Sequence, residues 1–295
     1  MTLSHIQRWV ERVYGACRVA FPRCEYPGCA FAEPGRWRAA AHGIRLHGQW
    51  YCSSPCFEAA ACRRFQRASA LVTGPASSAT HRRLPLGLLL FERGLVSQAQ
   101  LQSALREQRE NCGSRIGELL HEMGIVSQRQ ITSALGMQWA CPVLPESALS
   151  AVSVPALLPA VLLQRFGMLP VYFSNRRVLC VAFGTVPDYT ALYAVEQALA
   201  CRTEACIVDS AAMNAALSRH LRHPQPFDHL FEGPHTAGEM ARITCSCAIQ
   251  QGASEVRLAS CGEYLWARLE TPIRPANLLF EHRNAPTSGP CHAIR

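Results

Sequence analysis

Residues Pro85–Gln108 read PLGLLLFERGLVSQAQLQSALREQ, and residues Arg115–Gln138, thirty positions later, read RIGELLHEMGIVSQRQITSALGMQ. The two stretches are identical at 13 of 24 aligned positions, so this part of the chain is an internal repeat. In each copy, apolar residues at helical spacing precede a glycine that ends one helix and a serine that caps the next. The sequence therefore predicts a doublet of helix–turn–helix units over residues 83–140.

The residues after the doublet change their hydrophobic period. Met168–Phe173 and Arg177–Phe183 are rich in β-branched and aromatic residues and predict a hairpin, and Ala205–Val208 predicts a third strand. Tyr189–Ala200 and Ser210–Leu221 have helical spacing. We expect residues 141–221 to form a small α/β subdomain that packs with the doublet.

Two punctuated segments divide the rest of the chain. Residues 69–82 are small and polar around a Gly-Pro pair, which predicts a linker after a Cys-rich segment at 1–68. The segment 220–238 is rich in proline and glycine, and it precedes a helix and two strands predicted within 236–270. Residues 271–295 are expected to form a Pro-rich tail.

Four cysteines of the first segment have the spacing of a metal site. Cys24 and Cys29 flank a Pro-Gly turn, and Cys52 and Cys56 flank a second turn containing Pro55. Paired thiolates from two turns can meet at one tetrahedral ion, and four thiolates favour Zn²⁺. We therefore predict a structural zinc site in residues 1–68, a segment too small to fold on its apolar core alone. Alternative ligands are Cys17, Cys62, His42 and His47.

Composition excludes several chemistries. The chain has 295 residues and a net charge of +8, and all of its basic residues are arginine. Without lysine there is no P-loop lysine, Schiff base or lysine general base, and His121-Glu122 lacks the second histidine of an H-E-x-x-H motif. Because these motifs are missing, we predict a protein that is not an enzyme.

The beginning of the chain lacks the apolar core of a signal peptide, which favours a cytoplasmic location.

The repeated pattern resembles the MshEN domain, the N-terminal domain of type II secretion and type IV pilus assembly ATPases of the GspE/PilB kind. The resemblance extends through the α/β subdomain, and 237–270 looks like the start of the next domain of those ATPases. It implies a regulatory or adaptor protein without an ATPase domain, with secretion or pilus components as partners and a location peripheral to an inner-membrane machine.

Some MshEN domains bind cyclic di-GMP, with one half of the ligand on each repeat. The resemblance implies an Arg before the Leu-Gly pair, aliphatic contacts to the bases and a closing Gln. The second copy has an Arg at that position, whereas the first copy has Pro85 there. The matching positions are Leu86, Leu101, Leu105 and Gln108 in the first copy, and Arg115, Ile116, Ile131, Leu135 and Gln138 in the second.

The sequence thus predicts an α+β protein with a small zinc-binding module, a tandem MshEN-like repeat and a small α/β subdomain. The predicted function is docking to a secretion or pilus component, with cyclic di-GMP as an effector. The alternative function is a zinc-finger regulator that binds nucleic acid, because many arginines and aromatic residues surround the four cysteines.

Overall fold

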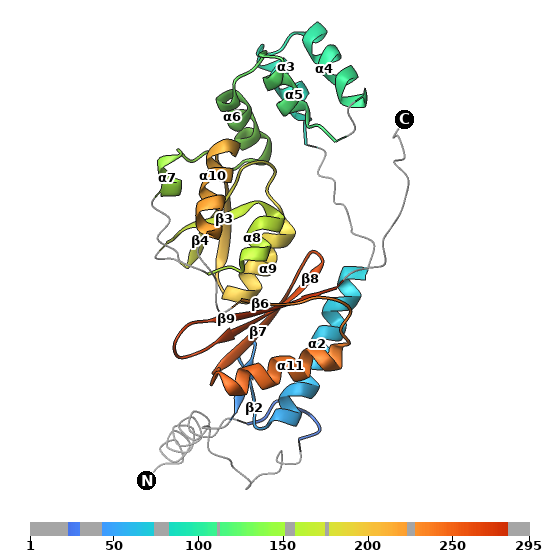
Figure 1. Cartoon of the computed structure of the whole chain (residues 1–295), viewed down its shortest axis with the longest axis vertical. Helices are drawn as coiled ribbons and strands as arrows, with labels where there is room; N and C mark the ends of the chain where they lie inside the picture. The colour runs from blue at the N-terminus through green and yellow to red at the C-terminus, as the bar shows by residue number, and fades with distance from the viewer. Residues whose placement is uncertain are drawn as a thin grey trace, which may run out of the picture. The chain divides into compact units, whose positions relative to one another are not determined.

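The computed structural model describes residues 23–29, 43–73, 83–110, 113–150, 157–174, 177–222 and 228–282. Within these ranges the chain forms helices and two β-sheets, and it divides into two compact units. The second unit holds the doublet and a three-stranded sheet. The first unit combines elements from the two ends of the described chain (Figure 1).

The doublet consists of four helices, α3 (Leu86–Glu92), α4 (Gln98–Glu110), α5 (Ile116–Glu122) and α6 (Gln128–Trp139). The first helix of each repeat is followed by a glycine with positive φ, 68° at Gly94 and 69° at Gly124. In both repeats a Ser-x-x-Gln capping box begins the second helix, where the Gln side chain accepts a hydrogen bond from the Ser backbone N–H. The prediction of four helices is confirmed, because each boundary is set by local residues.

The α/β subdomain follows the doublet in the chain. Its sheet has the order β3-β4-β5, with an antiparallel β3–β4 hairpin and a parallel β4–β5 pair. Val143 adds a single parallel bridge to Ile207, which joins the end of the doublet to this sheet. The elements are α7 (Ser147–Ser150), α8 (Ala160–Phe166), β3 (Met168–Phe173), β4 (Val178–Phe183), α9 (Tyr189–Leu199), β5 (Arg202–Ile207) and α10 (Ser210–Leu221).

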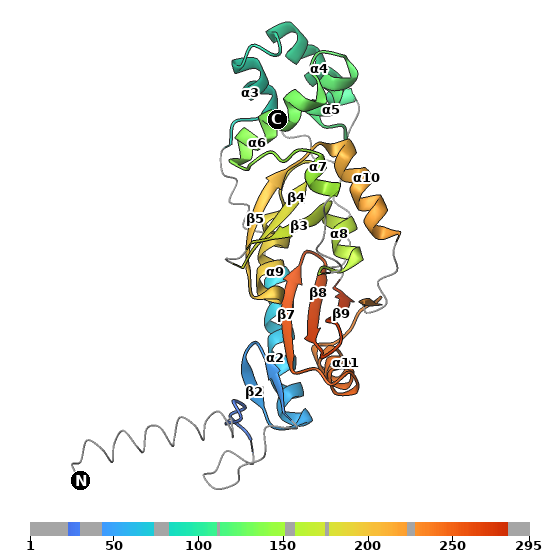
Figure 2. The same cartoon turned by 90° about the vertical axis from the view of Figure 1, so that its left-hand side faces the viewer.

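The first unit is built on a six-stranded sheet with the order β2-β1-β7-β8-β9-β6. Pairs β1–β2, β7–β8 and β8–β9 are antiparallel, whereas β1–β7 and β6–β9 are parallel. Figure 2 shows this sheet with its helices. The elements are β1 (Ile44–Leu46), β2 (Gln49–Tyr51), α2 (Ser54–Thr73), β6 (Asp228–Phe231), α11 (Ala237–Gln250), β7 (Glu255–Cys261), β8 (Tyr264–Glu270) and β9 (Ala276–Glu281).

Helices α2 and α11 contribute to one hydrophobic core with the sheet. Phe57 and Phe65 of α2 are almost completely buried, and the Phe65 ring meets Phe280 of β9 edge to face at 5.8 Å between centroids. Val256 and Leu278 are fully buried in the same cluster. A large aromatic core of this kind stabilises the unit through apolar burial and ring contacts.

The assembly of this unit differs from the separate modules that the sequence suggested. The two-residue register Arg45↔Glu255 and Leu46↔Val256 joins a strand of the Cys-rich segment to a strand of 236–270. Helix α2 continues through residues 69–73, at the start of the expected linker, and 276–281 of the expected tail form β9. The physical reason is that strands of three residues are too short to be stable alone and need a longer neighbour. Across the described residues, no helix combines the length and apolarity needed to cross a membrane.

Candidate metal centre and candidate recognition surface

Cys24 and Cys29 lie on a short knuckle that packs against β2. The knuckle turns at Pro27-Gly28, where the Cys29 N–H donates to the Tyr26 carbonyl at 3.1 Å. The Glu25 N–H donates to the Trp50 carbonyl at 3.0 Å and attaches the knuckle to the strand. The turn therefore brings both sulfurs to the same side, towards the end of β2.

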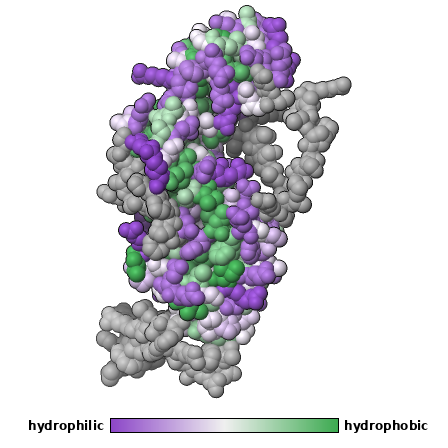
Figure 3. Space-filling model, in the orientation of Figure 1, coloured by the Kyte–Doolittle hydropathy of each residue, from purple (hydrophilic) through white to green (hydrophobic). Residues whose placement is uncertain are grey.

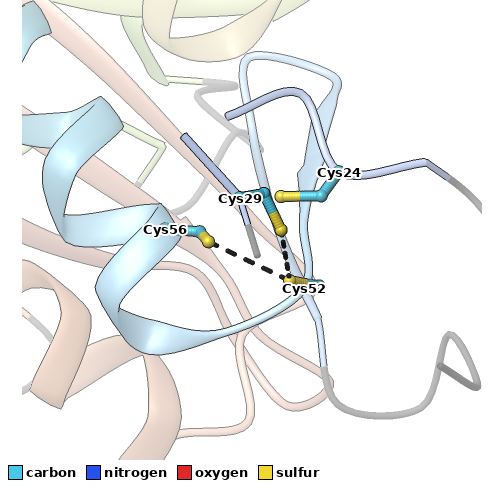
Figure 4. Close-up of side chains that lie close together, drawn as sticks. All are labelled: Cys24, Cys29, Cys52 and Cys56. Atoms are coloured by element: carbon cyan, nitrogen blue, oxygen red, sulfur yellow. Dashed lines mark hydrogen bonds between the residues drawn. The ribbon is translucent and has the colours of Figure 1, made fainter. Parts of the chain in front are cut away.

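Cys52 and Cys56 are placed by the junction between β2 and α2. Cys52 follows the strand directly, and Cys56 lies in the first turn of the helix, where the Phe57 N–H donates to the Ser53 carbonyl at 3.0 Å. Figure 4 shows the four side chains converging from the knuckle, the end of the strand and the helix. The two predicted pairs of cysteines therefore form one cluster.

The distances between the sulfurs fit a tetrahedral ion. Cys29 Sγ lies 3.5 Å from Cys52 Sγ, Cys52 Sγ lies 4.0 Å from Cys56 Sγ, and all four sulfurs lie within 4.8 Å of one another. A tetrahedral ion with metal–sulfur bonds of about 2.3 Å requires sulfurs about 3.8 Å apart. The 3.5 Å contact is much longer than a disulfide bond of about 2.05 Å. The cluster has the size of a metal site.

Burial and mutual proximity disfavour thiolates in this cluster when no cation is bound. Cys29, Cys52 and Cys56 are each less than a tenth exposed. Burial, followed by the hydrogen bond with Cys29, raises the pKa of the Cys52 thiol to about 12, and burial also raises the pKa of Cys56. A divalent cation reverses this preference, since a coordinating thiol loses its proton. The donor set therefore fits a thiolate-binding ion such as Zn²⁺.

The alternative ligands do not join the cluster within the described residues. His47 Nε2 accepts a hydrogen bond from the Leu258 N–H at 2.8 Å, which occupies that nitrogen at β7. Cys62 is not among the four clustered side chains. Cys17 and His42 lie outside the described residues.

In the doublet, the first helix of each repeat packs against the other repeat. A Cβ added to Gly117 would lie 3.2 Å from Leu86 Cδ2, and one added to Gly87 would lie 3.7 Å from Ile116 Cγ1. The same added atoms would also contact the partner helix of the same repeat, at Ile131 and Leu101 respectively. The two glycines thus permit a reciprocal close approach of the two repeats.

Two glutamines close the doublet in the same reciprocal way. Gln108 Nε2 donates to the Ser114 carbonyl at 2.9 Å, and Gln138 Nε2 donates to the Leu84 carbonyl at 2.8 Å. Gln108 and Gln138 are equivalent in the repeat, as are Leu84 and Ser114, so the two bonds are related by the same pseudo-twofold symmetry. We did not predict this pairing from the sequence, although the equal offset of both pairs was a signal for it.

The positions expected to contact a nucleotide are differently exposed. Leu101, Ile131 and Leu135 are each less than a tenth exposed, Leu86 and Ile116 are partly buried, and Leu105 and Arg115 are exposed. The last two lie on different repeats.

The arginine near the first helix lies at a different position in the two repeats. Pro85 is the residue before α3, where Arg115 precedes α5. Arg83 stacks its guanidinium over the Trp139 ring at 3.8 Å from the centroid. Arg83 is therefore held against α6 by a cation–π contact.

The outer side of α3 is apolar, whereas the equivalent side of α5 is polar. Leu88 and Phe91 are 44% and 41% exposed, and their equivalents in the second repeat are Glu118 and His121. Leu84, two residues before the start of α3, is 45% exposed. In Figure 3 the doublet, at the top, shows apolar side chains among hydrophilic ones on the face in view. We call Leu84, Leu88 and Phe91 the α3 strip.

About half of the chain is similar to known protein structures. No protein-family model and no curated protein matches the chain. A solved structure of MshE with cyclic di-GMP is 31% identical, and the match covers 47% of this chain and 99% of the MshE chain, with a TM-score of 0.38. Two crystal forms of the N-terminal domain of XpsE are 19% and 20% identical and cover 46% and 49% of this chain and 92% and 98% of theirs, with TM-scores of 0.36 and 0.30.

The second unit is a domain of tandem helix–turn–helix repeats with an attached α/β subdomain. The repeated motif and the 31% identity over 99% of the MshE chain identify its family. The chain belongs to the MshEN family, the N-terminal domains of the GspE type.

Proposed function

We propose that this chain is a cytosolic adaptor that docks to a component of a secretion or pilus machine through its MshEN-type doublet. The observation that carries this proposal is the asymmetry of the doublet. The two repeats share their packing and capping, yet only the first exposes an apolar strip on its first helix. Internal packing does not need this difference, because the second repeat forms the same helix with Glu118 and His121 in the equivalent positions.

The docking proposal is tested by exchanging residues between the repeats. Leu88→Glu and Phe91→His give the first repeat the residues that the second repeat already carries, so the fold is expected to tolerate them. Purified inner-membrane components of secretion and pilus machines would be immobilised, and binding of the full chain would be measured. We expect the double variant to lose binding at least about tenfold, as for loss of apolar anchors in an interface. The control is Glu118→Leu, which should bind like wild type; equal binding by all three proteins contradicts the proposal.

We also propose that cyclic di-GMP is an effector of the doublet. The pseudo-twofold arrangement suits a ligand with two equivalent halves, and the similar MshE was solved with this ligand. Arg115 is exposed at the start of α5, where its guanidinium can grip a guanine edge and the backbone N–H groups of the helix favour phosphate. The first repeat lacks this arginine, so its half of the ligand would be held by aliphatic contacts and by the loop before α3.

Titration calorimetry of the full chain with cyclic di-GMP tests this second proposal. Arg115→Ala should weaken binding about tenfold or more, since one charged bidentate contact contributes roughly 1–3 kcal/mol. Arg129→Ala is the matched control, because Arg129 is exposed on α6 of the same repeat. The absence of heat at tens of micromolar ligand for the wild type would remove cyclic di-GMP from the proposal and leave docking intact.

For the first unit, we propose that Cys24, Cys29, Cys52 and Cys56 hold one structural Zn²⁺. The support is the convergence of four sulfurs at distances close to those of a tetrahedral site, together with the burial of three of them. Four protein ligands leave no open position for a substrate, so the ion would fix the knuckle against β2 and α2. Metal analysis of the purified chain should give one zinc per molecule, and Cys24→Ser with Cys52→Ser should abolish it while Cys62→Ser should not.

A further inference from the structure

An arginine-lined cavity lies beside the knuckle. A cavity of about 140 Å³ opens between the knuckle, β2 and the middle of α2. It has the volume of a small anion with a few waters, and its lining is mostly polar. Three arginines dominate it, and the described residues that line it are Glu25, Tyr26, Pro27, Gln49, Tyr51, Ala60, Arg63, Arg64 and Arg67.

Among the described residues, the three arginines of this cavity have no carboxylate partner. No Asp or Glu among the residues that the structure describes lies within ion-pair distance of Arg63, Arg64 or Arg67. Arg63 and Arg67 are one helical turn apart, and like charges at this spacing destabilise a helix. Glu25 is the single acid among the described residues that line the cavity, so these residues together carry a net positive charge. An anion would relieve this repulsion.

Two of the arginines are oriented by the surrounding residues. Arg64 Nη2 donates to Gln49 Oε1 at 2.9 Å, and the same oxygen accepts from the Tyr51 hydroxyl at 3.2 Å. The Arg63 guanidinium lies over the Tyr26 ring, 5.4 Å from its centroid. These contacts use only part of each guanidinium, which has five N–H donors. Among the described residues no other hydrogen bond uses the remaining donors, so a ligand can accept from them, and their orientation is already restricted before it binds.

We propose that this cavity binds the phosphate group of a small phosphorylated ligand, a phosphate monoester. A phosphate dianion has three terminal oxygens to share among three guanidinium groups, whereas a carboxylate has two. A nucleic acid strand is disfavoured because its binding needs positive charge along a groove that follows several phosphates. Here the three arginines line one cavity, which Glu25 also lines.

The knuckle contributes residues both to the cysteine cluster and to the proposed phosphate site. Glu25, Tyr26 and Pro27 lie between the cluster residues Cys24 and Cys29. An ion that fixes both cysteines also fixes the ring on which Arg63 stacks. The phosphate site is therefore expected to require the intact cysteine cluster.

Calorimetric titration of the full, metal-loaded chain with inorganic phosphate and with phenyl phosphate tests the proposal. The ionic strength is held constant with sodium chloride, so that general salt effects on the protein cancel. We expect saturable binding of both compounds, weakened at least about tenfold in Arg63→Gln/Arg67→Gln, because hydrogen bonds to charged groups are among the stronger ones. Glu25→Gln should bind more tightly, since it removes a negative charge from the lining.

Arg242→Gln is the matched control, because Arg242 is an exposed arginine on α11 of the same unit and does not line the cavity. This variant should bind phosphate like wild type. For every variant, an unchanged zinc content and an unchanged melting temperature show that the protein is folded. Phosphate binding that is absent, or equal in all variants, overturns the proposal. The proposal is also overturned if a single-stranded oligonucleotide binds more tightly than phenyl phosphate and the Arg63→Gln/Arg67→Gln variant loses that binding. This outcome would favour nucleic acid as the ligand.

Discussion

His47 is held in its neutral form between the β1–β2 turn and β7. Burial, reinforced by the positive charges of Arg64 and Arg257, lowers its pKa to about 4. An unfolded chain binds this proton near pH 6.5, whereas the folded chain resists it until about pH 4. Stability from this residue is therefore complete above pH 6.5 and is lost as the pH falls towards 4.

We predict that the first unit loses about 1 kcal/mol of unfolding free energy between about pH 7 and about pH 5 from His47 alone, a figure reduced for solvent screening of a partly exposed ring. Urea unfolding of the wild type and His47→Asn at several pH values measures it. Asparagine tolerates the positive φ of 49° at this position and does not titrate. If the unfolding free energies of the two proteins change with pH in parallel, His47 contributes nothing to the pH dependence of stability.

At the scale of elements, the glutamine bonds between repeats should stabilise the doublet. Gln108→Ala and Gln138→Ala each remove a side-chain hydrogen bond to a backbone carbonyl of the other repeat. We predict a loss of about 1 kcal/mol for each, measured as a lower denaturation midpoint of the second unit. Gln102→Ala, at an exposed position of α4, is the control and should change stability by less than about 0.5 kcal/mol. Equal effects at all three positions would contradict a role for the reciprocal bonds.

The elements of the doublet could be predicted because their limits are set by adjacent residues. Gly94 and Ser97, and their equivalents Gly124 and Ser127, fix helix ends through backbone conformation and local hydrogen bonds. The four cysteines could be placed together because each pair lies within one turn. By contrast, the sequence does not predict β6, since Asp228–Phe231 has only four residues between Pro226 and Pro234 and is a strand because it pairs with β9.

The pairing of β1 with β7 could not be predicted from one sequence. Arg45 and Glu255 are 210 positions apart, and nothing in a three-residue strand specifies such a distant neighbour. The Gln49–Arg64 contact that orients the phosphate cavity has the same origin, because it depends on how α2 packs beside β2. Local patterns thus predicted which four cysteines lie together, whereas the arrangement around them came from tertiary packing.

At the scale of the whole molecule, metal removal should affect the two units differently. Cys29, Cys52 and Cys56 belong to the same hydrophobic core as Val256, Leu278 and Phe280. We therefore predict that a zinc chelator loosens the six-stranded sheet as well as the knuckle, while the doublet and its α/β subdomain stay folded. Hydrogen exchange measured by mass spectrometry should show faster exchange in β7 and β8 and unchanged exchange in α4 and α6. Uniform protection after chelation, with zinc shown to be released, would contradict a structural role for the ion.

The parallel pairing of β1 with β7 also has a consequence during protein synthesis. The ribosome makes β1 and β2 before β7, and the whole MshEN-type unit is translated between them. Strand β1 must therefore wait without β7 as its neighbour, while the unit that lies between the two strands in the sequence can already fold. Such an exposed edge is a natural target for a chaperone or for mispairing with a neighbouring nascent chain.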